Sequence, residues 1–65
     1  MTLNQYLMAA NAAYLDNPWR IGQAYFNVLD EVRPDLANSI RGTVHDPFYR
    51  DAILPHFLAI IAGEW

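Results

Sequence analysis

With 65 residues and no cysteine, the chain has room for a single domain, residues 1–65, that no disulfide can reinforce. Its net charge of −3 and its four basic residues, all arginine, argue against a nucleic-acid partner, because the phosphate backbone attracts positively charged surfaces. Its 54% content of hydrophobic residues exceeds what so small a core can hide, which predicts that the chain forms a homo-oligomer.

Apolar residues at helical spacing predict two helices in the first half of the chain. Thr2 followed by Gln5 matches a capping box, so the first helix is expected to begin there. It should end before Pro18, because the residue before a proline avoids helical backbone. The second helix is expected from about Trp19 to Val32, with Asn17 as its N-cap and Pro18 in its first turn.

Gly22 lies within the second predicted helix, where glycine costs about 1 kcal/mol relative to alanine. Its presence predicts that another helix approaches closely at this point. Pro34 ends the segment, and Asp35 is then expected to cap a short helix from Leu36 to Arg41. Gly42 fits the left-handed position that commonly follows the end of a helix.

Residues 43–50 are predicted to connect this short helix to the last one. Within the connector, Asp46 followed by Pro47 resembles a cap with a first-turn proline, which predicts a single helical turn. The adjacent aromatic residues, Phe48 and Tyr49, are expected to pin the connector to the core.

The last helix is expected to begin near Asp51 or Leu54 and to end at about Ala62. Apolar residues cover most of its circumference, which is typical of a helix that is buried or shared with a second chain. The predicted oligomer interface consists of Phe57, Ile60, Ile61 and Trp65. The expected fold is therefore all-α, a compact bundle of about four short helices that is completed by homo-oligomerisation.

A polar strip on the second helix is the first candidate binding site. Arg20, Gln23 and Asn27 lie along one side, opposite the apolar face. The strip is either a solvated helix face or a recognition surface. In the second case, the amide side chains suit a base edge, a peptide backbone or a partner side chain.

A second candidate site surrounds Gly42. Arg41, Thr43 and His45 bring a guanidinium, a hydroxyl and an imidazole together near helix ends. These groups either complete a helix C-cap or bind an anion such as a nucleotide phosphate.

Four blocks of the sequence carry a resemblance: Arg20–Leu29, Arg33–Ala37, Ile40–Thr43 with Asp46–Tyr49, and Phe57-Leu58 with Trp65. These blocks resemble a group of very short proteins carried by tailed phages and prophages, and the resemblance covers nearly the whole chain. The resemblance implies a phage accessory protein that acts on host physiology or defence. It implies no catalytic residues.

No motif in the sequence predicts an enzyme, because the chain has no Gly-x-Ser-x-Gly, no Walker loop and no Gly-x-Gly-x-x-Gly. No metal or cofactor is expected, since His45 and His56 are the only nitrogen ligands and no thiolate accompanies them. No apolar stretch reaches the roughly 20 residues that a membrane span needs. No signal peptide is recognisable, so the expected location is the cytoplasm of the bacterial host.

These observations favour a binding protein. The leading hypothesis is stoichiometric binding that inhibits or modulates a host protein. The first alternative is an oligomeric sponge that sequesters a nucleotide signalling molecule. The second alternative is a minor structural or assembly component of the virion.

Overall fold

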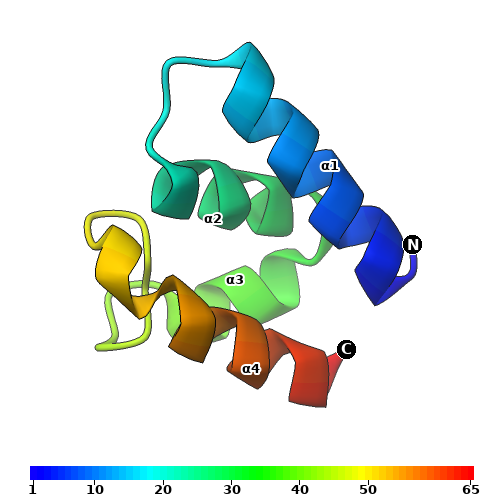
Figure 1. The fold of residues 1–65 in the computed structure, drawn as a ribbon. Helices are drawn as coiled ribbons and strands as arrows, with labels where there is room; N and C mark the ends of the chain where they lie inside the picture. Colours follow the sequence, from blue (N-terminus) through cyan, green and yellow to red (C-terminus); the bar gives the residue numbers. More distant parts are fainter.

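Four α-helices and one short 3-10 helix make up the fold in this computed structural model, which describes residues 1–65 (Figure 1). The elements are α1 (Leu3–Asp16), α2 (Ile21–Val32), α3 (Pro34–Ile40), η1 (Asp51–Ile53) and α4 (Leu54–Glu64). No strand is present, so the predicted all-α class and the number of α-helices are confirmed. No helix combines the length and the apolar character needed to cross a membrane.

The predicted cap at the beginning of α1 is present, whereas the predicted role of Asn17 is wrong. The Thr2 hydroxyl accepts from the Gln5 amide at 3.1 Å, and the Gln5 side chain accepts from the Thr2 amide at 2.9 Å, so the predicted capping box is present. Asn17, however, is the C-cap of α1, and its side-chain amide donates to the Ala13 carbonyl at 3.0 Å. Because Asn17 is engaged there, α2 begins two residues later than predicted, after Arg20 as its N-cap.

The beginning of α3 also differs from its prediction. Pro34 occupies the first turn and Arg33 is the N-cap, so Asp35 lies inside the helix and does not cap it. The Arg33 guanidinium instead donates two hydrogen bonds, of 3.1 and 3.0 Å, to the Asp35 carboxylate. These bonds lower the pKa of Asp35 and raise the pKa of Arg33. The end of α3 is as predicted, since Gly42 has a φ of 75°.

The core forms where α2 meets the other helices. In Figure 1, α2 lies in the middle of the molecule, with α1 on one side and α3 and α4 on the other. Tyr6 of α1 is completely buried, and its hydroxyl donates to the Tyr25 carbonyl at 2.6 Å. Its ring packs on Trp65 with the centroids 5.2 Å apart, and the Trp65 indole donates to the Met1 carbonyl at 3.1 Å. These contacts hold the two ends of the chain side by side (Figure 1).

Because the phenol of Tyr6 is buried, the free energy of unfolding is expected to fall at alkaline pH. Burial, together with the nearby Tyr25, raises the pKa of Tyr6 above its ordinary value of about 10. Above that pH the unfolded chain loses the proton more readily than the folded chain. The free energy of unfolding should therefore be unaffected by Tyr6 below about pH 10 and fall above it, by up to about 1.4 kcal/mol per pH unit.

Chemical denaturation of the wild type and of Tyr6→Phe between neutral and alkaline pH measures this effect. Tyr6→Phe should lose about 1 kcal/mol at neutral pH, because the hydrogen bond to Tyr25 is gone. It should also lose most of the alkaline dependence. Tyr49→Phe is the matched control, since the Tyr49 ring is 79% exposed. Equal alkaline dependence in the wild type and Tyr6→Phe would refute the assignment.

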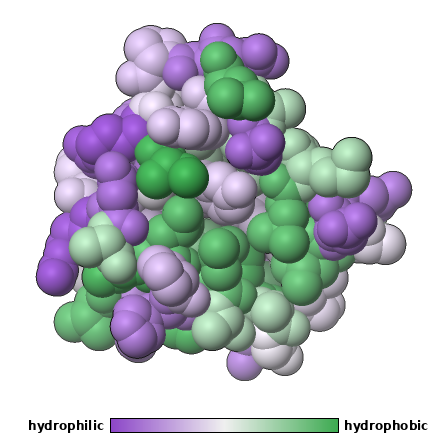
Figure 2. Space-filling model, in the orientation of Figure 1, coloured by the Kyte–Doolittle hydropathy of each residue, from purple (hydrophilic) through white to green (hydrophobic).

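The predicted oligomer interface is largely occupied within the single chain. Phe57 and Ile61 are completely buried in the core, so their side chains are not part of an outer surface. Ile60 and Trp65 are half-buried against the same core. Figure 2 shows hydrophobic atoms in the middle and lower part of one face, where Figure 1 places α3 and α4, yet every large apolar side chain of these helices is buried or half-buried.

Candidate functional site

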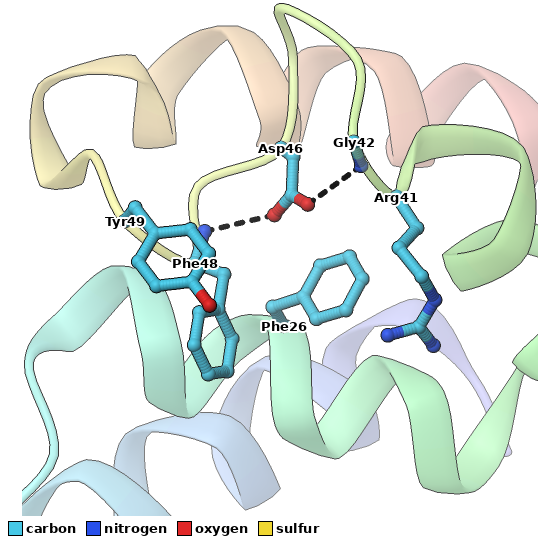
Figure 3. Close-up of a pocket in the computed structure, with 6 residues that line it drawn as sticks. All are labelled: Phe26, Arg41, Gly42, Asp46, Phe48 and Tyr49. Atoms are coloured by element: carbon cyan, nitrogen blue, oxygen red, sulfur yellow. Dashed lines mark hydrogen bonds between the residues drawn. The ribbon is translucent and has the colours of Figure 1, made fainter.

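A surface hollow of about 280 Å³ lies between α2, the end of α3 and the connector that follows it (Figure 3). It is the one pocket that the molecule contains. The residues that line it are Phe26, Arg41, Gly42, Asp46, Phe48 and Tyr49. We call residues 41–50 the recognition loop.

Three aromatic rings form one side of the hollow. Phe26, from α2, is almost fully buried and meets the half-buried Phe48 edge to face, with the ring centroids 6.2 Å apart. Phe48 in turn meets Tyr49 at 4.7 Å. Tyr49 is 79% exposed, so the prediction that it pins the connector to the core is wrong, whereas Phe48 does pack there. The row of rings leads from the core to the solvent.

Asp46 fixes the shape of the recognition loop. Its two carboxylate oxygens accept hydrogen bonds from the backbone amides of Gly42 and Phe48, each at 2.9 Å, as Figure 3 shows. An aspartate that binds nearby backbone amides in this way stabilises a turn. The single helical turn predicted at Asp46-Pro47 does not form.

The C-terminal end of the loop is held against the beginning of α2. The Arg20 guanidinium donates to the Phe48 carbonyl and lies 3.6 Å from the Asp51 carboxylate. The same carboxylate accepts from the Gly22 amide at 3.1 Å. A Cβ at Gly22 would overlap the Pro47 carbonyl and come within 2.9 Å of Asp51. The predicted close approach at Gly22 is thus present, but the approaching segment is the loop and the short 3-10 helix η1, and not another α-helix.

Arg41 holds the N-terminal end of the loop against the C-terminal end of α2. Its guanidinium pairs with the Asp30 carboxylate at 2.8 Å and lies over the Phe26 ring, 5.1 Å from the centroid. The charges of Arg41 and Asp46 cancel within the lining, and Asp30 adds a negative charge beside it. The hollow is therefore better suited to an apolar or cationic group than to an anion.

The six residues predicted from sequence do not converge on one site. Arg20 lies at the beginning of α2, and the Asp30 partner of Arg41 lies ten residues further along, about 15 Å away on the helix axis. Gln23 and Asn27 lie between them and are half-buried. Only Arg41 lines the hollow.

The other two predicted residues belong to the loop backbone. The Thr43 hydroxyl donates to the Ile40 carbonyl at 2.6 Å and accepts from the His45 amide at 3.2 Å, so it shapes the end of α3. His45 is exposed and does not line the hollow. Sequence reasoning missed Phe26 as part of the site, because no local pattern in the sequence distinguishes it from other core residues.

No three or more histidine, cysteine, aspartate or glutamate residues lie together in a way that would hold a metal ion. Comparison with protein-family models, with curated proteins and with solved structures finds no match to this chain. The resemblance to short phage proteins thus stays a prediction, and the geometry of the recognition loop is the structural evidence that bears on function.

Proposed function

We propose that the chain is a binding module that acts stoichiometrically on a partner protein through its recognition loop. The observation that carries this proposal is the exposure of two large apolar side chains on a firmly held loop. Val44 is 74% exposed and Tyr49 is 79% exposed. Tyrosine and arginine are among the residue types most often found at the energetic centre of protein interfaces, and Arg41 lines the same hollow as Tyr49, on its opposite side (Figure 3).

The anchoring of the loop supports the proposal. Asp46 bridges the loop internally, and Arg20 and Arg41 tie it to opposite ends of α2. A loop that is already ordered loses little conformational entropy when a partner binds, so more of the contact energy contributes to affinity. The hollow beside Tyr49 is suited to one apolar or basic side chain of the partner, because Asp30 and Asp46 outweigh Arg41.

We further propose that the partner is a protein of the bacterial host and that binding inhibits or modulates it in the host cytoplasm. The resemblance to phage accessory proteins supports this identity. A role as a virion component has no feature of the recognition loop in its favour.

A nucleotide is the second candidate ligand. Aromatic rings stack on bases, and Tyr49 and Phe48 line the hollow together with Arg41. This candidate ranks behind a protein partner, because Asp30 already neutralises Arg41 and Asp46 places a carboxylate in the same hollow.

Quantitative affinity capture from bacterial lysate tests the leading proposal. Tyr49→Ala should reduce the captured partner at least tenfold, since the loss of an interface tyrosine commonly costs about 2 kcal/mol or more. Tyr14→Ala, which removes an exposed tyrosine from α1, is the matched control and should capture as the wild type does. Equal capture by Tyr49→Ala would contradict the role of the loop.

We also propose that the chain self-associates. Besides Val44 and Tyr49, large apolar side chains remain exposed elsewhere on the surface, and isolated small domains commonly gain stability from a second copy.

A further inference from the structure

An uncharged ridge runs along the outer side of α1. Its members are all exposed and recur at helical spacing: Asn4, Met8, Asn11, Ala12 and Leu15. Met8 is 67% exposed and Leu15 is 72% exposed, whereas α2, α3 and α4 carry no exposed large apolar side chain. Figure 1 shows α1 as an outer layer of the molecule, which packs on α2 with its opposite side. We call this surface the α1 ridge.

We propose that the α1 ridge binds the α1 ridge of a second copy, with the two helices antiparallel. This inference rests on the proposed self-association and names its surface. The absence of charge on the ridge is the first argument for this occupant. The chain carries a net charge of −3, so two copies repel each other overall, and contact through an uncharged surface adds nothing to that repulsion.

The ends of α1 explain the antiparallel direction. Asp16, the last residue of α1, is its only charged residue, and no basic residue in the last turn compensates it. A carboxylate at the C-terminal end of a helix is unfavourable, because the helix dipole is negative there. When two α1 helices pair antiparallel over their full length, each Asp16 lies beside the positive first turn of the partner helix. A parallel pair would instead bring the two carboxylates together.

The side chains also match in this direction. Full overlap of a helix that spans residues 3–16 pairs position 3 with 16, and therefore position 4 with 15 and position 8 with 11. Met8 then packs close to Asn11 and Ala12 of the second copy, a large flexible side chain against smaller ones. Asn4 lies opposite Leu15, whose apolar side chain covers the stem of the amide.

Sedimentation of matched variants tests the surface. The wild type should sediment as a dimer, and Met8→Glu should sediment as a monomer with unchanged helical circular dichroism. Val44→Glu places the same charge on an equally exposed apolar residue outside the ridge and should stay dimeric. A monomeric wild type would overturn both the self-association and its surface. A Met8→Glu protein that stays dimeric would overturn the surface alone.

Single cysteines test the direction, because the chain has no cysteine of its own. A mixture of Asn4→Cys and Leu15→Cys proteins should form a disulfide-linked heterodimer under mild oxidation. Neither protein alone should cross-link efficiently, since identical positions would lie about 16 Å apart along the axis, far beyond disulfide reach. A homodimer of Asn4→Cys without the heterodimer would overturn the antiparallel arrangement.

Discussion

Ile61→Glu is expected to unfold the chain, because Ile61 is completely buried between α4 and the rest of the core. The substitution removes apolar burial and places an unpaired carboxyl group in the interior, which together should cost about 3–5 kcal/mol. A 65-residue domain typically has a free energy of unfolding of roughly 3–10 kcal/mol, so most of its stability would be lost. Thermal unfolding followed by circular dichroism measures the effect.

Ala59→Glu is the control for this prediction. Ala59 lies two residues earlier on α4 and is exposed, so the same charge there should change stability by about 0.5 kcal/mol or less. If Ile61→Glu instead kept its helical signal and only dissociated an oligomer, Ile61 would be an interface residue, as the sequence suggested. The structure predicts loss of the fold itself.

Gly22→Ala is expected to destabilise the protein although alanine favours helices. The added Cβ would meet the Pro47 carbonyl and Asp51, both parts of the segment that packs on the first turn of α2. Backbone cannot move aside as a flexible side chain does, so the loop must shift at a cost of about 1–3 kcal/mol. Denaturant titration should show the loss, together with faster amide exchange in the recognition loop.

Gly63→Ala provides the matched control, because a Cβ at Gly63 has no atom within 4 Å. The substitution should stabilise α4 by up to about 1 kcal/mol through helix propensity alone. Opposite signs for the two glycines are the expected result. A higher melting temperature for Gly22→Ala would mean that the loop does not lie against α2.

The sequence predicted the helices well where a local signal determines them. Apolar spacing located the four helices, Thr2 and Gln5 marked the first beginning, and Gly42 marked the end of α3. It failed where one polar residue had two possible local roles. Asn17 was a plausible cap for either neighbouring helix, and the hydrogen bond to Ala13 decides in favour of α1.

The candidate site was harder to predict, because its contacts join residues that are distant in sequence. Arg20 contacts the Phe48 carbonyl 28 residues later, and Gly22 binds Asp51 29 residues later. No spacing rule connects such pairs, so the sequence left Arg20 and Arg41 open between a structural and a binding role and gave no sign of the contacts by which they anchor the loop. The sequence also gave no sign that Tyr49 is exposed, since an aromatic residue next to Phe48 is ordinarily assigned to the core.

Native mass spectrometry of the protein captured with its partner is the most direct test of the proposed function. We expect an intact complex of this chain with one host protein in a fixed subunit ratio, absent when Tyr49 is replaced by alanine. The same spectra report how many copies of the chain are present. A nucleotide-sized mass that stays on the chain under native conditions and leaves on denaturation, with no protein partner, would contradict the account.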